Sequence, residues 1–274
     1  MARELPRTLM SLSRAFQRGV EDLSYEIIVI DNGSDRLPDL PAMQPAPLLR
    51  RASICVPSPV GALNEALSLA RAPLVGAFID GARMASPGLL RAAHDAAQCH
   101  AHPVIALPNR QLGPNWQAIS AQDGYDRATE DALLAQAGWP DPAADLFAVS
   151  FPETRQITDP MLESNALFLK ADDWQRLGGF DPGFDEAGGG AANPDVFLRA
   201  NALAGAQLIR VSGEATFHQI HGGTTTAGRD AAVAALKAAS RSYMRLRGKP
   251  LRKVAQRGWI YDARTGTLDR GMSV

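Results

Sequence analysis

The stretch Tyr25–Ser34, with the sequence YEIIVIDNGS, decides the fold of this chain. The apolar run Ile27–Ile30 inside it predicts a strand that is buried on both faces, because such strands carry continuous β-branched residues. Asp31, Asn32 and Gly33 follow at once and favour a turn that ends the strand. A strand of this kind is typical of a parallel sheet that is covered by helices.

Strands and helices alternate along most of the remaining sequence. We expect strands at 25–30, 52–56, 73–79, 104–107, 164–169 and 207–211. We expect helices at 7–16, 60–70, 86–99, 172–177, 195–204 and 229–247. The segment 113–160 is irregular and polar, and we interpret it as a substrate loop or an insertion. The alternation predicts one α/β domain with a mostly parallel sheet flanked by helices, followed by a basic C-terminal helical extension.

The composition excludes several classes of protein. Hydrophobic residues make up 46% of the chain, which is enough for a folded core and excludes a disordered protein. Lys and Arg total 28 against 29 Asp and Glu, and this balance argues against a nucleic-acid partner. Cys55 and Cys99 lack the spacing of a zinc module, and no apolar run approaches the ~20 residues that span a bilayer. The charged start Met1–Glu4 is unlike a secretory signal, so we expect a soluble cytoplasmic protein.

The near-zero net charge conceals two regions of opposite charge. Residues 121–200 contain 15 acidic and five basic residues, whereas residues 237–274 contain ten basic and two acidic ones. Ordinary solvated faces are one interpretation of this division. The other is an acidic active-site cleft with a basic tail that contacts a phosphate, an acidic glycan or an anionic membrane surface.

Two of the predicted strands end in an aspartate, Asp31 and Asp80. In an open α/β sheet, ligands bind beyond the carboxyl ends of the strands, so acids placed there are the first candidates for a functional site. A single aspartate at such a position is a common turn residue. Two aspartates, each after an apolar strand, indicate a ligand site at this edge of the sheet.

Four segments of the chain together match a known pattern. They are Tyr25–Ser34, ALSLARAPLVGAFID at 66–80, LGGFD at 177–181, and His218 with HGGT at 221–224. In this order they resemble family 2 glycosyltransferases, which have the GT-A fold. The first looks like the nucleotide-binding signature of that family, and the second lies where the family carries its diphosphate and metal motif. The resemblance implies a GT-A (Rossmann-like) domain at 1–228 and a basic helix and tail at 229–274 that pack on it.

The resemblance implies a transferase that moves a sugar from a nucleotide-diphosphate donor to a hydroxyl of a glycan, lipid-linked or other acceptor, with inversion. Asp31 and Asn32 correspond to residues that hydrogen-bond the base and ribose, with a turn role as the alternative. Asp80 matches the first acid of the family's Asp-x-Asp motif, which holds Mn²⁺ or Mg²⁺ against the diphosphate. Ala82 replaces the second acid, and Arg83 follows it. Either Asp80 and a histidine together suffice to bind the metal ion, or Arg83 supplies part of the positive charge that the metal ion would otherwise bring to the diphosphate.

Two further pairs of residues complete the site that the resemblance implies. Family members often place a metal-binding histidine where His218 and His221 stand. We favour His221 as the ligand and keep His218 as the second choice, while a structural role in a turn is the alternative for at least one of them. Glu163 and Asn165 would lie on the acceptor side of the site.

The candidate base for the acceptor hydroxyl is Asp195. In the family, the base belongs to a Glu-Asp pair a few residues before a helical arginine, and counting back from Arg199 this pair is Ala192-Asn193. Asp195 is the nearest replacement, and a helix cap is its alternative role. Asp185 and Glu186, in a glycine-rich loop, are the reserve candidates.

The resemblance also indicates a missing element. Family members begin with a strand whose terminal turn contacts the nucleotide, and a helix like that at 7–16 follows it. This chain begins at the helix. We therefore expect Met1 to be either an internal methionine of a longer gene product or the start of a truncated copy. The strand would lie centrally in the sheet, so its neighbours would keep unpaired backbone groups.

Two other functions compete with a glycosyltransferase. A catalytically degenerate protein that binds nucleotide sugar without turnover is favoured by the absent second acid, the absent Glu-Asp pair and the absent strand. A nucleotidyltransferase is disfavoured, because the chain lacks an early loop rich in Gly and in Arg or Lys. The leading hypothesis is an enzyme that uses a nucleotide sugar and has peripheral membrane contact through its basic tail.

Overall fold

The computed structural model describes residues 1, 3–221 and 229–271 of the chain. Of the fourth matching segment, His218 and His221 are described, whereas Gly222, Gly223 and Thr224 lie outside the described residues. Among the described residues, no helix is both long and apolar enough to cross a membrane.

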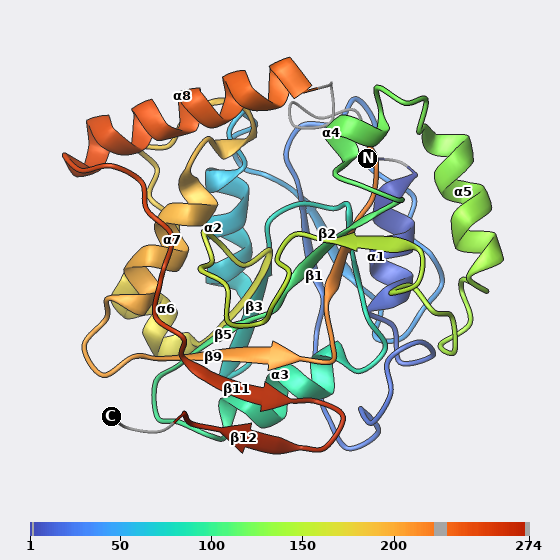
Figure 1. Cartoon of the computed structure of the whole chain (residues 1–274), viewed down its shortest axis with the longest axis horizontal. Helices are drawn as coiled ribbons and strands as arrows, with labels where there is room; N and C mark the ends of the chain where they lie inside the picture. The colour runs from blue at the N-terminus through green and yellow to red at the C-terminus, as the bar shows by residue number, and fades with distance from the viewer. Residues whose placement is uncertain (2, 222–228, 272–274) are drawn as a thin grey trace.

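A six-stranded sheet forms the centre of the molecule (Figure 1). Its order is β12-β11-β9-β5-β8-β3, with β3 at Leu74–Phe78, β5 at Pro103–Ala106, β8 at Ala166–Lys170, β9 at Gln207–Ser212, β11 at Trp259–Asp262 and β12 at Thr267–Asp269. β5, β9 and β11 pair in parallel, and β8 runs antiparallel to both β5 and β3. Four strands, β3, β5, β9 and β11, therefore run in the same direction.

Two smaller sheets stand beside this one. β1 (Ile28–Asp31) pairs in parallel with β2 (Leu48–Arg51). A four-stranded sheet has the order β4-β10-β6-β7, with β4 at Arg83–Ala85, β6 at Asn109–Leu112, β7 at Ser150–Pro152 and β10 at Thr216–His218. The antiparallel pairing of β4 with β10 brings the residues after β3 against the histidine segment.

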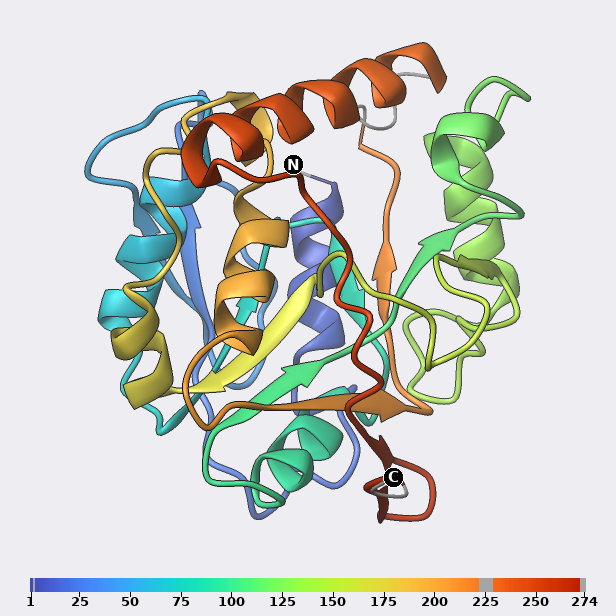
Figure 2. The same ribbon diagram turned by 60° about the vertical axis from the view of Figure 1, so that its left-hand side comes forward.

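Helices cover both faces of the main sheet. Those on one face are α1 (Glu4–Ser11) and α3 (Leu89–Ala97), and those on the other are α2 (Val60–Leu69), α6 (Ala171–Leu177) and α7 (Ala192–Asn201). α8 (Arg229–Arg247) lies across the end of α7 in both views (Figures 1 and 2). α4 (Gln117–Ser120) and α5 (Arg127–Gln136) lie to one side, and a short 3-10 turn occupies Ala187–Gly189.

The core follows from the alternation of side chains along the central strands. On β8, Leu167 and Leu169 belong to the apolar cluster under α6 and α7, whereas Ala166 and Phe168 belong to the cluster under α3. Successive side chains of a strand point to opposite faces, so one strand serves both clusters. The expected α/β architecture, a Rossmann-like sheet flanked by helices, is confirmed.

Several boundaries differ from the sequence-based expectation. The strand expected at 52–56 is wrong: β2 precedes it, and the Glu65 carboxylate accepts a hydrogen bond from Ser53 N–H at 2.9 Å, which ties that segment to α2. The first helix begins earlier than expected, at Glu4, with Pro6 tolerated in its first turn. The segment 113–160 is less irregular than expected, because it contains α4, α5 and β7.

The tail beyond α8 contributes to the main sheet. β11 pairs in parallel with β9, and β12 forms the outer edge. The positive φ of Gly258, +67°, allows the turn into β11, where a Cβ would meet the Leu208 main chain at 2.7 Å. The basic tail is thus partly an edge hairpin of the sheet.

Candidate active site

The polar residues that follow β3 meet the two histidines at and just beyond the end of β10. Asp80 closes a turn, because its Oδ1 accepts a hydrogen bond from Ala82 N–H at 2.8 Å. Arg83 donates from Nε to Asp80 Oδ2 at 3.2 Å. In the β4-β10 ladder, His218 stands opposite Arg83. The pairing of two strands thus places an aspartate, an arginine and a histidine together.

Asp80, His218 and His221 form a cluster that could hold a metal ion. Each offers one ligand atom, and these atoms all lie within 4.8 Å of one another. The Nε2 atoms of the two histidines are 3.1 Å apart. Carboxylate oxygen and imidazole nitrogen together suit a borderline divalent ion such as Mn²⁺. The two histidines expected as alternatives are therefore brought to the same cluster.

The charge states of the cluster favour metal binding. Burial lowers the pKa of His218 well below its usual value, and the charge of Arg83 adds to this effect. Burial likewise lowers the pKa of His221. Burial alone would raise the pKa of Asp80, but the charge of Arg83 and the hydrogen bond from Ala82 N–H bring it below its usual value. Neutral imidazoles and an ionised carboxylate are the ligand forms that a cation needs.

Arg83 connects this cluster to a second row of polar side chains. Its Nη1 donates to Asn109 Oδ1 at 3.1 Å, and Thr216 Oγ1 donates to the same oxygen at 2.9 Å. Asn109 in turn donates to the carboxylate of Glu153. Asn109 and Glu153 were not predicted from the sequence, because only the pairing of β6 with β7 and β10 places them here.

Asp31 and Asn32 lie at the carboxyl end of β1, as expected, and they organise the loop that follows. Asp31 is buried, and its Oδ2 accepts a hydrogen bond from Ser34 N–H at 3.2 Å. Asn32 Nδ2 donates to Val56 O at 2.7 Å and to Ser58 O at 3.1 Å. These contacts fit the alternative role of Asp31 as a turn residue that closes the strand. Both residues also line the cavity that reaches Asp80.

Glu163 and Asn165 lie together, and Asn193 joins them. Asn193 Nδ2 donates to Glu163 Oε2 at 2.9 Å and to Asn165 Oδ1 at 3.1 Å. Burial raises the pKa of Glu163, the charge of Glu153 adds to this, and the charge of Arg83 opposes it. Asn165 O accepts a hydrogen bond from Ile79 N–H at 3.4 Å, so Glu163 and Asn165 lie beside the end of β3, next to Asp80.

Asp195 lies in an ion pair between two helices. Its side chain is fully buried. Arg199 Nε donates to Oδ2 at 2.7 Å, and Arg247 donates from Nε to Oδ1 at 2.6 Å and from Nη2 to Oδ2 at 2.8 Å. Both carboxylate oxygens are thus held by guanidinium groups, which suits an anchor between α7 and α8. The two reserve candidates for the base are not part of this ion pair. Asp185 is exposed, and Glu186 pairs with Arg245 at 3.6 Å.

The buried carboxyl group of Glu130 holds the main chain between His218 and His221. Glu130 on α5 accepts a hydrogen bond from Ile220 N–H at 2.7 Å and pairs with Arg3 at 3.1 Å. Burial raises the pKa of Glu130 to about 7. Nothing in the sequence around Glu130 identifies it, because its partners are about 90 and 127 positions away.

Comparison with known proteins adds a similarity of fold. No protein-family model and no curated protein sequence matches the chain. Its fold is similar to that of S. aureus TarS, a glycosyltransferase, with a TM-score of 0.50 and 13% sequence identity. The match covers 88% of this chain and 38% of TarS, so the chain spans well under half of that protein. The chain thus has a glycosyltransferase-like Rossmann fold.

Two structures of TarS 1-349 also match, one of them in complex with UDP. Their TM-scores are both 0.47, at 12% and 15% identity, over 88% of this chain and 62% of theirs.

Proposed function

We propose that this chain is a glycosyltransferase that transfers a sugar from a nucleotide-diphosphate donor to an acceptor hydroxyl, with inversion. The observation that carries the proposal is the cluster of Asp80, His218 and His221 beside Arg83, beyond the carboxyl end of β3. Sugar transfer from such a donor releases a diphosphate, and fixed positive charge beside the departing oxygens lowers the barrier. The fold shared with a glycosyltransferase supports the proposal at the level of architecture.

A divalent cation fits this cluster, and when bound it would neutralise part of the charge on the diphosphate. One carboxylate with two imidazoles suits Mn²⁺ better than Mg²⁺, which prefers oxygen ligands throughout. Arg83 would add positive charge from the protein itself. Asp31 and Asn32, at the end of β1, would face the nucleoside.

For the acceptor hydroxyl, we propose Glu163 as the base and keep Asp195 as the alternative. The Glu163 side chain is only partly buried, and its Oε1 makes no hydrogen bond with a described residue. In the transfer, Glu163 would take the hydroxyl proton while the oxygen bonds to the anomeric carbon and the bond from that carbon to the diphosphate breaks. A raised pKa makes a carboxylate a better base near neutral pH. Asn165 and Asn193 would orient the carboxylate from the acceptor side.

The metal part of the proposal is tested by binding. We expect Asp80→Asn and His221→Gln each to weaken Mn²⁺ binding at least about tenfold, since removal of even an indirect partner of a metal site costs that much. Titration calorimetry with Mn²⁺, alone and with uridine, guanosine and thymidine diphosphates, measures the affinities. Asp269→Asn, in an exposed pair with Arg257 on β12, is the matched control. Unchanged Mn²⁺ affinity in both site variants would contradict the site.

A catalytically degenerate nucleotide-sugar-binding protein is the second candidate. The observation that favours it is the engagement of both Asp195 oxygens by arginines, together with Asn193 where the family has an acid. Donor hydrolysis in the presence of Mn²⁺ separates the two functions. Binding of a nucleoside diphosphate without any donor turnover would leave only this second function.

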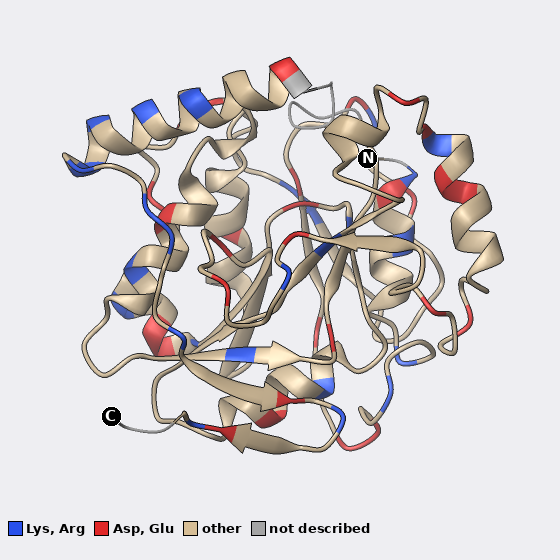
Figure 3. Cartoon of the chain, viewed as in Figure 1, with Lys and Arg blue, Asp and Glu red and all other residues tan. Residues whose placement is uncertain are grey.

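We also propose peripheral contact of α8 with an anionic membrane surface on the cytoplasmic side. Val233, Leu236 and Met244 are exposed apolar side chains on α8, and Lys237 and Arg241 lie at helical spacing on the same face. Figure 3 shows basic residues along this helix. Sedimentation with phosphatidylserine vesicles, compared with neutral vesicles, measures the contact. The double variant Lys237→Glu, Arg241→Glu should abolish it, and equal sedimentation of wild type with both kinds of vesicle would refute it.

A further inference from the structure

A row of paired residues runs straight across the small sheet β4-β10-β6-β7. His218 on β10 is paired with Arg83 on β4 and with Gln111 on β6, and Gln111 is paired with Phe151 on β7. Residues paired in this way lie on the same face of a sheet. We call Arg83, His218, Gln111 and Phe151 the cross-strand row. Because neighbouring strands are about 4.8 Å apart, it leads from the metal-type cluster of Asp80 and the histidines to an aromatic side chain roughly 10 Å beyond His218.

The two faces of the small sheet differ in polarity. The residues that alternate with the cross-strand row are buried in one apolar cluster, and they include Met84, Leu112 and Phe217. Successive side chains of a strand point to opposite faces, so the cross-strand row belongs to the other, polar face. Its side chains become more exposed away from the metal-type cluster: His218 is buried, whereas Gln111 and Phe151 are half-buried. A ligand could therefore reach this face at its β7 side.

A second line of polar residues runs beside the cross-strand row. Thr216 is paired with Asn109, and Glu153 N–H donates to Asn109 O at 3.1 Å. Asn109 and Gln111 both donate from their side-chain amides to Glu153 Oε1, the latter at 3.0 Å. The other carboxylate oxygen, Oε2, makes no hydrogen bond with a described residue. Glu153 is half-buried, so it offers one hydrogen-bond acceptor beside the row.

An exposed tryptophan stands at the aromatic end of the row. The centre of the Trp116 ring lies 6.1 Å from that of Phe151, and Trp116 is 41% exposed. The next residue, Gln117, fixes the start of α4: its N–H donates to Gln111 Oε1 at 2.6 Å, and its Nε2 donates to His218 O at 2.8 Å. Two members of the cross-strand row thus hold the segment that carries Trp116.

The proposed base adjoins the same face. Ser164, next to Glu163, accepts a hydrogen bond at Oγ from Leu107 N–H at 3.0 Å. Leu107 lies two residues before Asn109, so this contact brings Glu163 to the start of β6. Arg83 Nη1 also donates to Asn109 Oδ1 at 3.1 Å. The proposed base and the metal-type cluster therefore meet the polar face at the same residue, Asn109.

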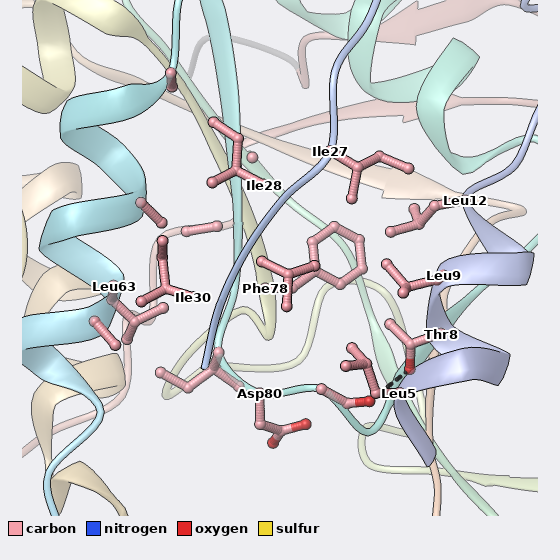
Figure 4. Close-up of a pocket in the computed structure, with 18 of the residues that line it drawn as sticks. Leu5, Thr8, Leu9, Leu12, Ile27, Ile28, Ile30, Leu63, Phe78 and Asp80 are labelled. Carbon is pink, nitrogen blue, oxygen red and sulfur yellow. Dashed lines mark hydrogen bonds between the residues drawn. The ribbon is translucent and has the colours of Figure 1, made fainter. Parts of the chain in front are cut away.

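The nucleoside side of the proposed site is a separate space. A cavity of about 610 Å³ lies between β1 and β3 and is lined by Asp31 and Asn32, with Asp80 at one end (Figure 4). No member of the cross-strand row lines this cavity. In a transfer with inversion, the acceptor oxygen attacks the anomeric carbon from the side opposite to the departing diphosphate. Donor and acceptor therefore need separate spaces that meet at the metal-type cluster.

We propose that Trp116, Phe151, Gln111 and Glu153 bind the acceptor, and that the acceptor is a neutral sugar. This rests on the proposed function, which puts the donor diphosphate at the other end of the cross-strand row. An aromatic ring packs against the C–H face of a sugar ring, while amide and carboxylate groups bond to the hydroxyls at its rim. Phe151 and Glu153 are two residues apart, roughly 7 Å along the chain, which is about the span of one sugar ring.

Glu153 determines which kind of acceptor fits. A carboxylate oxygen only accepts hydrogen bonds, so its free oxygen suits a hydroxyl group. Among the described residues, Glu153 is bonded to amides and not to a cation, and Glu163 brings a second carboxyl group to the start of β6. A phosphate or carboxylate on the acceptor would be repelled there. A hydrocarbon chain would leave the polar groups of Glu153 and Gln111 without partners, which is costly.

The test measures binding of methyl glucoside, methyl galactoside and methyl mannoside to the full chain by saturation-transfer NMR and tryptophan fluorescence. We expect at least one of them to bind, and Trp116→Ala to weaken it at least about tenfold, since stacking and burial against an aromatic ring contribute about this factor. The matched control is Phe147→Leu. Phe147 is similarly exposed, at 37%, but it packs against Phe217 on the apolar face of the small sheet. The control should bind the sugar as the wild type does.

The charge of the acceptor is tested by comparing each neutral glycoside with its uronate, which has the same ring and adds a carboxylate. We expect the neutral member to bind at least about tenfold more tightly, because of the repulsion from Glu153. Glu153→Gln should reduce this preference at least about fivefold, since it removes the charge and keeps a group of the same shape. Uronates that bind as tightly as the neutral glycosides would assign the row to an anionic acceptor and overturn the proposal.

Two further outcomes would overturn it: no binding of any neutral glycoside, or equal effects of Trp116→Ala and Phe147→Leu. The Mn²⁺ titration reports on the proposed function separately. A wild type that binds Mn²⁺ but no neutral glycoside would refute the sugar acceptor and leave the proposed function standing. Sugar binding that depends on Trp116 in a chain without Mn²⁺ affinity would support the sugar site and count against the proposed function.

Discussion

At Glu163 and Asp195, different surroundings give two carboxyl groups different capacities. Glu163 is held by the neutral amide of Asn193, and burial raises its pKa. Asp195 is held by the guanidinium groups of Arg199 and Arg247. The Asp195 carboxylate is fully buried and both its oxygens accept hydrogen bonds from arginines, whereas Glu163 is held through one oxygen by an amide and keeps the other available. This contrast underlies the choice of Glu163 as base.

We expect Glu163→Gln to lower the rate of donor turnover by about 10²–10⁴-fold, the usual contribution of a general base. The wild-type rate should rise with pH through the raised pKa of Glu163, because the base form gains population, and the variant should lose this rise. Steady-state kinetics across pH measure both effects. Asp195→Asn serves as the comparison: a rate loss confined to that variant would assign the base to Asp195.

Glu130 gives the stability of the protein a pH dependence. Its pKa is raised by burial to about 7 in the folded chain, against an unfolded value of about 4.3. Folding therefore favours the protonated form, and this contribution is complete below about pH 4 and is lost as pH rises through 7. Relative to Glu130→Gln, the wild type should lose up to about 3 kcal/mol of stability between pH 4 and 8.

Urea denaturation of the wild type and Glu130→Gln at several pH values measures this difference. A constant difference across pH would show that Glu130 does not titrate in this range. Because Glu130 bonds to Ile220 N–H, the variant also reports whether this contact supports the histidine segment.

At the level of elements, α7 and α8 are joined by a buried ion pair. Arg247, at the end of α8, donates to both Asp195 on α7 and Asp181 in the preceding loop. Its guanidinium also lies 5.6 Å from the centre of the Phe184 ring. The pair thus holds the long basic helix against the body of the protein.

We expect Arg247→Met to destabilise the protein by about 2–4 kcal/mol, because it leaves the buried Asp195 with one arginine in place of two. Arg245→Met is the matched control, since Arg245 is exposed and its pair with Glu186 is long, at 3.6 Å. The control should change stability by less than about 1 kcal/mol. Equal effects of the two variants in urea denaturation would contradict a buried anchor.

At the scale of the whole molecule, the candidate site is assembled from distant parts of the chain. Asp80 follows β3, Glu163 precedes β8, and His218 ends β10. The carboxyl end of β3 meets the start of β8 because these strands are antiparallel, and β4 pairs with β10 beside them. The end of β3 and the β4-β10 pair therefore lie side by side. This brings Asp80 and His218, which are 138 positions apart in the sequence, to one metal-type cluster.

The sequence determined the elements whose pattern is local. The run Ile27–Ile30 with its turn, the apolar strand before Asp80 and the alanine-rich helix Arg229–Arg247 were all predicted, because period and turn chemistry are properties of neighbouring residues. The resemblance predicted Asp80 as a metal ligand with His221, or else His218, and the structure brings all three side chains together. The edge hairpin after Gly258 was missed, since a short strand is stable only where a sheet edge accepts it.

The tertiary structure alone decided which partners hold each carboxyl group and where the cavity between β1 and β3 lies. The sequence made Asp195 the candidate base and placed Glu163 on the acceptor side, but an arginine 52 positions away bonds to Asp195 and not to Glu163. Likewise, the sequence predicts apolar strands without showing which neighbours they have. Main-chain hydrogen bonding and burial depend on contacts between remote segments, so only the folded chain shows the cavity between β1 and β3.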